Sequence, residues 1–285
     1  MAERTYTVDQ RRVVQYSIGI SFAVVALMAL AVAYLPYGVD WDLTYGKATR
    51  DVFSGRSPYE GDSIFYSPPW TAIPLVPFAP APLEVGRAAV FLVAVLSYAY
   101  VFYWLGGRPA GIVAFLVSPF LVHGLINANV DWLVLLGVTL PPRWGIFFIL
   151  VKPQVAVGVA LFWLVEAWRD GGWRGVVATF APVTAALLLT FILYGFWPAH
   201  GLNAPGYHNN RSLFPWSVPF GLALMWLAIR QRDVKPALAA SPLLAPYVLL
   251  HSWCGVLLAL AGRPRLAVWA VILSWVGFGL AMNIG

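Results

Sequence analysis

Charge is scarce in this chain of 285 residues. Charged residues make up 11% of it, and hydrophobic residues make up 60%. Soluble domains carry about 25% charged residues, because their surfaces have to be covered with polar side chains. The low charge content therefore excludes an ordinary soluble enzyme.

Cysteine and carboxylate clusters are also lacking. Cys254 is the only cysteine and lies in an apolar run, which excludes disulfides and a cysteine metal site. No dense carboxylate cluster lies deep in an apolar run, so we expect neither a metal nor another cofactor. The net charge of +6 comes from residues dispersed over short loops, which favours the bilayer surface and phosphate groups as partners over nucleic acid.

Long apolar runs are what the sequence does contain, for example 13–35, 90–105, 145–165 and 176–193. Runs of roughly 17–25 apolar residues can span a membrane. The first run lacks a small-residue cleavage site, so we expect a retained helix and not a signal peptide. The sequence predicts one all-α, polytopic membrane domain over 1–285. Its helices are expected at 13–35, 66–82, 87–105, 110–124, 128–141, 145–167, 175–195, 214–230, 237–260 and 266–283, with the two shortest re-entrant or tilted.

The orientation rests mainly on Arg11 and Arg12, which directly precede the first apolar run. Basic residues mark the cytoplasmic side, and the first helix usually dominates. The N-terminus is therefore expected inside the plasma membrane, with loops 36–65 and 196–213 outside. In this threading the other basic residues are nearly balanced, with Arg87 and Arg230 inside but Arg108 and Arg263 outside.

Acidic residues are concentrated in segment 36–65, the predicted long first outer loop. It holds five of the twelve acids of the chain: Asp40, Asp42, Asp51, Glu60 and Asp62. Asp40 and Asp42 lie where the first helix leaves the membrane. A carboxylate there is partly desolvated and suits general-base work. A solvated loop with an Asp that caps a helix is the structural alternative.

The order of residues in this loop carries a resemblance to a known family. The loop reads Asp-Trp-Asp-Leu-Thr-Tyr-Gly from Asp40, then Gly-Arg-Ser-Pro-Tyr ending at Tyr59, then Tyr-Ser-Pro-Pro from Tyr66. This pattern resembles the first outer loop of the GT-C glycosyltransferases. It is most similar to glycosyltransferase family 87, the polyprenyl-phosphate-mannose-dependent mannosyltransferases.

Three later stretches are similar to the same family in the same order. They are Val-Lys-Pro-Gln at 151–154, Asn-Asn-Arg-Ser-Leu at 209–213 and Ala-Ser-Pro-Leu-Leu-Ala-Pro-Tyr at 240–247. The chain is short for that family, and the spacing after the Asp differs by about one residue. Asp40 and Asp42 therefore compete for the catalytic position, and alignment on Tyr45-Gly46 favours Asp40.

Two ionisable residues in apolar runs are expected to lie at the same depth in the membrane. At about 1.5 Å per helical residue, Lys152 and His251 each lie about 22 Å from the predicted cytoplasmic end, beneath loop 36–65. Buried ionisable groups in a membrane are usually functional. The alternatives are a Lys152 that extends to the headgroups and a His251 that bonds between helices. Asp131, near Asn127 and Asn129, is expected to pair with an Arg or to touch substrate.

The resemblance implies a GT-C-like bundle of roughly 9–10 transmembrane or re-entrant helices with its active site outside. It implies an inverting enzyme that transfers a sugar, mannose by the resemblance, from a polyprenyl or dolichyl phosphate to a glycan or glycolipid acceptor. A small transporter or flippase and a non-catalytic subunit of a membrane complex are the rival functions. Besides the base, Asp40 or Asp42, the residues expected to bind donor or substrate are Lys152, His251, Gln154, Lys47, Arg50, Tyr59, Tyr66, Asn209 and Asn210.

Overall fold

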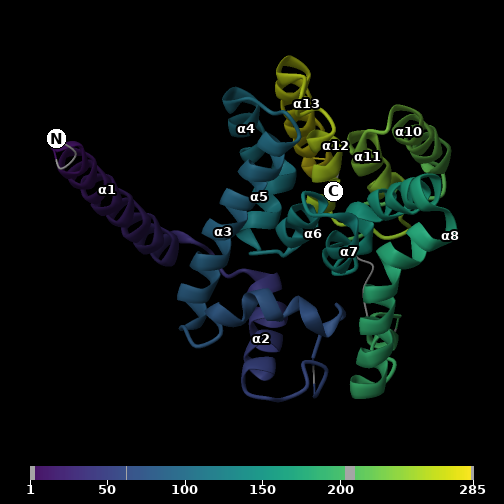
Figure 1. Ribbon diagram of the computed structural model, residues 1–285, viewed down its shortest axis with the longest axis horizontal. Helices are drawn as coiled ribbons and strands as arrows, with labels where there is room; N and C mark the ends of the chain where they lie inside the picture. Colours follow the sequence, from purple (N-terminus) through teal and green to yellow (C-terminus); the bar gives the residue numbers. More distant parts are fainter. Residues whose placement is uncertain (1–3, 62, 203–208, 284–285) are drawn as a thin grey trace.

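The computed structural model describes residues 4–61, 63–202 and 209–283, and every regular element in these ranges is helical. The prediction of an all-α chain is therefore confirmed for the described residues. Two helices are long and apolar enough to cross a membrane, α3 (Leu83–Trp104) and α8 (Pro153–Tyr194), and a bent pair of helices can form a third span. The first helix, α1 (Arg4–Tyr34), extends away from the other helices (Figure 1).

The first loop folds as a π-helix, η1 (Asp40–Tyr45), that continues into α2 (Gly46–Phe53). The Trp41 side chain is buried against Gly86 and donates a hydrogen bond from Nε1 to the carbonyl oxygen of Leu83 at 3.1 Å. Residues 40–46 therefore pack against the first turn of α3, and α2 continues to the lower end of the molecule (Figure 1).

The prediction of a spanning helix at 66–82 is wrong. This stretch forms two short 3-10 helices, η2 (Pro69–Thr71) and η3 (Ile73–Phe78), between proline-rich segments. Each proline lacks a backbone donor, and so many of them cannot be accommodated in one α-helix. The chain therefore does not cross the molecule here. As a result α3 begins beside η1, and Arg87 lies near Asp42, not in a loop at the opposite end.

Helices α4 (Pro109–Leu116) and α5 (Pro119–Ile126) form the pair bent by 58°. They are followed by α6 (Asp131–Val138) and α7 (Pro142–Ile149), each of eight residues. Eight helical residues extend about 12 Å, less than half of a hydrocarbon core of about 30 Å. The pair α6–α7 is therefore a hairpin that enters the bundle and returns from it, with Pro141 and Pro142 at its turn.

Helix α8 is two helices joined at Gly172, where φ is +57° and ψ is −148°. A residue with a Cβ is strained at this positive φ, so glycine permits the chain to turn there. Before the turn, α8 lies against α10 (Val218–Gln231), and Arg169 donates to the Ile229 carbonyl oxygen. After it, α8 ends near the first loop, where the Tyr194 and Tyr59 rings are 5.7 Å apart.

The last part of the chain is also interrupted. The short helix α9 (Pro198–Leu202) follows α8, and α10 turns tightly into α11 (Val234–Leu244). The segment 245–249 is extended. It leads into the 3-10 helix η4 (Leu250–Trp253), then α12 (Cys254–Leu258) and α13 (Pro264–Asn283). The expected single helix over 237–260 is thus broken where His251 lies.

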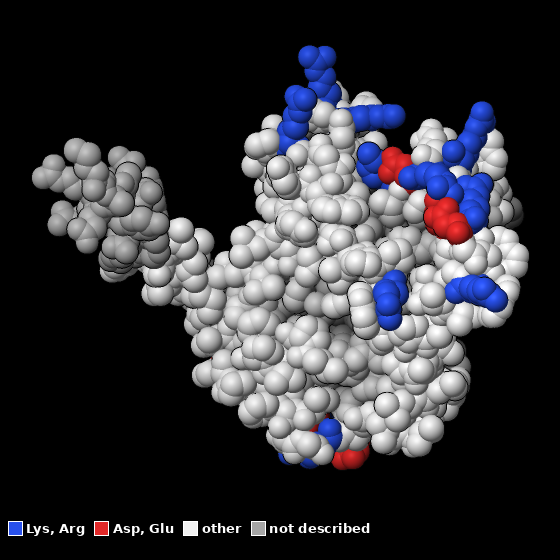
Figure 2. Space-filling model, in the orientation of Figure 1, with Lys and Arg blue, Asp and Glu red and all other residues white. Residues whose placement is uncertain are grey.

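Lys and Arg side chains gather at the upper end of the molecule over α4, α10, α11 and α13, and a smaller group with acids lies at the lower end (Figure 2). Contacts join the upper group: Lys235 lies beside Gly262, and Arg232 pairs with Glu166 and Asp170. The threading separated Arg108 and Arg263 from Arg230, and this is wrong. Leu105 and Gly106 line one cavity with Val234 and Lys235. The segments 128–141 and 237–260, which the threading counted as spans, do not form single crossing helices. We call this region the basic end. It is formed by the basic residues at the helix ends and turns that meet there: Arg108, Arg169, Arg174, Arg230, Arg232, Lys235, Arg263 and Arg265.

Candidate functional site

The centre of the candidate site is the Asn129 carboxamide, which is almost fully buried. Its Oδ1 accepts hydrogen bonds from Lys152 Nζ at 3.0 Å and from the Asp131 backbone N–H at 2.8 Å. Its Nδ2 donates to Asp40 Oδ2 at 2.5 Å and lies 3.0 Å from His251 Nε2. Both amide donors and both acceptor positions are therefore used, and this fixes the orientation of the amide.

These contacts also determine the tautomers of two histidines. His251 Nε2 faces two donors, Asn129 Nδ2 and Lys152 Nζ, the latter at 3.3 Å. Because Nε2 must accept, the His251 proton is on Nδ1, which donates to His123 Nδ1 at 3.2 Å. The two rings stack with centroids 5.4 Å apart. The remaining His123 nitrogen, Nε2, consequently carries a hydrogen, and His123 is exposed.

Lys152 is buried in an ion pair with Asp131, whose side chain has no exposed surface. Lys152 Nζ lies 2.9 Å from Asp131 Oδ1, and Ser252 donates to Asp131 Oδ2 at 3.2 Å. The partner expected for Asp131 was an arginine or the substrate, and the structure provides a lysine. Lys152 Nζ thus has three polar neighbours: it donates to Asn129 Oδ1, lies 3.3 Å from His251 Nε2 and forms an ion pair with Asp131.

Asp40 and Asp42 have different environments. Asp42 Oδ2 accepts from the Arg87 guanidinium at 2.6 Å and from the Gly38 backbone N–H at 2.6 Å, and its side chain is fully buried. Asp40 is half-buried, and the neutral amide of Asn129 is its hydrogen-bond partner. Asp42 therefore neither caps a helix through its side chain nor faces solvent, whereas Asp40 has both a fixed position and access from outside the bundle.

Breaks between helices bring these residues together. Asn129 lies between α5 and α6, Lys152 lies between α7 and α8, and His251 lies in the interruption between α11 and α12. The chain just after the first loop covers the break between α7 and α8, because the Ser67 hydroxyl donates to the Val151 carbonyl oxygen at 3.1 Å. Pro153 and Pro246 lie at two of these breaks, and Ala128, with a φ of +48°, lies at the third. These breaks are the local reason why polar side chains from distant segments meet.

Tyr59 and Tyr66, also expected to contact substrate, lie in or beside an aromatic cluster. The Tyr59 ring stacks on Trp197 at 5.9 Å and on His200 at 5.8 Å, and its hydroxyl donates to the Ser67 carbonyl oxygen at 2.7 Å. Burial raises the pKa of the Tyr59 phenol, so it remains a donor. Tyr66 is exposed and approaches Gly201 in α9. This cluster joins the first loop to the end of α8.

Asn210 has a structural position. Its side chain donates to the Pro246 carbonyl oxygen and accepts from the Val248 and Ser212 backbone N–H groups, each at 3.0 Å. It therefore orients the extended segment before His251. Asn209 is exposed beside it. Among the described residues, the side chains of Lys47, Arg50 and Gln154 make no hydrogen bond or ion pair, and nothing joins them to the Asn129 network.

Three residues of the site were not predicted as such. His123 is a single polar residue in an apolar run, and Arg87 was assigned to the cytoplasmic end of the predicted helix 87–105, away from Asp42. Asn129 was detectable: Asn127, Asn129 and Asp131 alternate with apolar residues between two apolar runs, and this pattern indicates a polar turn at depth. No group of three potential metal ligands occurs within residues 4–61, 63–202 and 209–283.

Comparisons with known proteins identify no relative: no family model, no curated protein and no solved structure matches this chain.

Proposed function

We propose that the protein is a multi-pass membrane glycosyltransferase of the GT-C type, similar to glycosyltransferase family 87. It transfers a sugar, mannose by the resemblance, from a polyprenyl or dolichyl phosphate to a glycan or glycolipid acceptor. The observation that carries the proposal is the position of Asp40. Its half-buried carboxylate is fixed by Asn129, which is in turn held by Lys152, at the meeting point of segments that resemble the family.

In the proposed reaction the acceptor hydroxyl oxygen attacks the anomeric carbon while the bond between that carbon and the phosphate oxygen breaks. Asp40 takes the hydroxyl proton. The polyprenyl phosphate leaves with the electron pair of the broken bond, and the configuration at the anomeric carbon is inverted. The negative charge that develops on the leaving phosphate has to be stabilised by hydrogen-bond donors in fixed positions. We propose His123, which contacts His251, and Arg211 as these donors; Arg211 is exposed, and its backbone N–H donates to the Val248 carbonyl oxygen at 2.7 Å, three residues before His251. In this mechanism Lys152 and His251 hold Asn129, and through it Asp40, in position.

The membrane embedding that this reaction requires is supported by the distribution of charge. Helix α3, of 22 residues, runs from the Asp42–Arg87 ion pair to the basic end. At about 1.5 Å per residue its length is about 33 Å, close to the thickness of a hydrocarbon core, about 30 Å. Basic residues mark the cytoplasmic side. We therefore place the basic end inside and the first loop with Asp40 outside the plasma membrane.

A transporter remains the second candidate because of one observation. Both Lys152 and His251 lie at interruptions between helices, and transporters bind substrates at such interruptions. Transport and transfer differ in their products: transport leaves the substrate unchanged, whereas transfer releases polyprenyl phosphate and makes a new glycosidic bond.

The proposal is tested by incubating the purified protein, in lipid nanodiscs, with labelled polyprenyl-phosphate mannose and glycolipid acceptors. We expect label in the acceptor and stoichiometric polyprenyl phosphate. Arg211→Gln should raise the KM for the donor roughly 10- to 100-fold, because a hydrogen bond to a charged group contributes about 1.5–3 kcal/mol. Movement of unchanged substrate across vesicles without transfer would instead support the transporter.

The orientation is tested by cysteine labelling in a Cys254→Ala background. A cysteine at position 56 should react with an impermeant reagent from outside, whereas cysteines at 170, 231 and 265 should react only after permeabilisation. Position 265 is the most informative one, because the threading with a span at 66–82 puts it outside. Labelling of 170, 231 or 265 in intact cells would contradict the proposed orientation.

A further inference from the structure

The basic end is built from four separate loops. The α3–α4 loop contributes Arg108, the α10–α11 turn contributes Arg232 and Lys235, and the loop before α13 contributes Arg263 and Arg265. The part of α8 around Gly172 contributes Arg169 and Arg174. Acids at this end, Glu166, Asp170 and Asp233, neutralise mainly Arg232, Arg169 and Lys235.

The other cations of the basic end are available to a partner. Arg108, Arg263 and Arg265 are exposed, and none has an acidic partner in the described part of the chain. Three unpaired cations near one another repel, which costs stability in the free protein. Such a group suits an anionic partner.

Exposed tryptophans accompany these cations. Trp104, Trp168, Trp173, Trp226 and Trp269 are each 46–63% exposed and lie within about one and a half helical turns of the basic end. The Arg174 and Arg230 guanidinium groups lie over the Trp173 and Trp226 rings at 5.5 and 5.0 Å. Tryptophan concentrates at the headgroup level of bilayers, because its ring is apolar and its N–H is polar.

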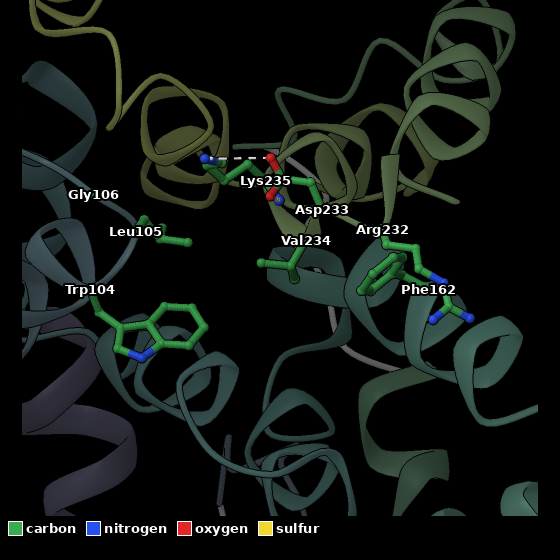
Figure 3. Close-up of a pocket in the computed structure, with 8 residues that line it drawn as sticks. All are labelled: Trp104, Leu105, Gly106, Phe162, Arg232, Asp233, Val234 and Lys235. Atoms are coloured by element: carbon green, nitrogen blue, oxygen red, sulfur yellow. Dashed lines mark hydrogen bonds and ion pairs between the residues drawn. The ribbon is translucent and has the colours of Figure 1, made fainter. Parts of the chain in front are cut away.

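A cavity of about 410 Å³ opens at this end between α3, α8 and α11 (Figure 3). Its walls include the apolar side chains of Leu105, Phe162 and Val234. Lys235 and Asp233 lie on its upper rim, and the Trp104 ring lies at the opposite side (Figure 3). An apolar interior with a charged rim suits an amphiphile.

We propose that the basic end is a binding surface for anionic phospholipid headgroups, with the cavity between α3, α8 and α11 as its most enclosed part. The proposal commits to lipid because tryptophans and apolar cavity walls accompany the cations. A small soluble anion would leave the tryptophans without a role, and a nucleic acid, which can stack on tryptophan, would leave the apolar cavity walls without one. The proposal does not depend on the glycosyltransferase function.

The experiment measures binding of phosphatidylglycerol and phosphatidylcholine to the purified full-length protein by native mass spectrometry from detergent. The wild type should retain phosphatidylglycerol preferentially. The triple variant Arg108→Gln, Arg263→Gln, Arg265→Gln should lose about fivefold in relative affinity per cation, on the order of 100-fold in total. The matched variant Lys47→Gln, Arg50→Gln, Arg56→Gln removes three cations from the opposite end and should keep the preference.

Two further measurements keep the test independent of folding of the variants. Added salt should weaken phosphatidylglycerol binding to the wild type, and inorganic phosphate at equal ionic strength should compete no better than chloride. Equal retention of the two lipids by the wild type would overturn the proposal. So would an equal loss in both triple variants, or displacement of the lipid by inorganic phosphate or by a short RNA.

Discussion

Asp40→Asn is expected to lower kcat for sugar transfer by about 10²–10⁴-fold while leaving donor affinity nearly unchanged, the range typical for loss of a general base. The substitution retains the side-chain shape, and its amide can be placed beside Asn129 with little loss of packing. The measurement is steady-state kinetics of transfer with the donor concentration varied.

Asp42→Asn is the matched control, two residues along the same π-helix. From the sequence, a capping Asp42 would cost under tenfold in activity. The structure shows instead a buried ion pair with Arg87 at 2.6 Å. Removing one partner of a buried pair costs about 3–5 kcal/mol, so Asp42→Asn should reduce the folded fraction and leave kcat per folded molecule within about tenfold. A larger loss of kcat in Asp42→Asn than in Asp40→Asn would transfer the role of base to Asp42.

Lys152→Met is expected to lower the free energy of unfolding by about 3–5 kcal/mol, because it leaves the fully buried Asp131 carboxylate without its cation. The measurement is a denaturant titration of the purified protein in mixed micelles. Lys152→Arg should also lose stability, since a planar guanidinium cannot reproduce three contacts made by one ammonium.

Two variants show whether the ion pair is the cause. The double variant Lys152→Met, Asp131→Asn should recover most of the stability, because no buried charge remains unpaired. Arg56→Met breaks the exposed pair with Asp51 and should change stability by under about 1 kcal/mol. If Lys152→Met were as stable as the wild type, the Lys152–Asp131 pair would not hold the site together.

Part of the site was accessible from the sequence because charge in an apolar run is rare. Counting residues placed Lys152 and His251 at the same depth, and in the structure Lys152 Nζ and His251 Nε2 are 3.3 Å apart. The two side chains meet although the count assumed an unbroken helix over 237–260, which the structure interrupts between Leu244 and Leu250. The acid-rich loop likewise indicated Asp40.

Connectivity could not be predicted in the same way. Segment 66–82 is apolar enough to be counted as a span, but its prolines prevent an α-helix. The segments 128–141 and 237–260 were also counted as spans, and this put Arg108 and Arg263 at the opposite end from Arg230. Segment 128–141, which contains α6, was recognised as short for a span, whereas most of α7 fell within the predicted span 145–167. Contacts between distant segments, such as His123 with His251 and Asp42 with Arg87, leave no periodic signal in a single sequence.

The configuration of the transferred sugar tests the central claim most directly. With purified protein and polyprenyl-phosphate mannose of defined anomeric configuration, NMR of the product reports the new glycosidic bond. A single displacement assisted by Asp40 predicts a product of the opposite configuration, formed about 10²–10⁴-fold more slowly by Asp40→Asn. Retention of configuration, or transfer at the wild-type rate by Asp40→Asn, would contradict the proposed mechanism.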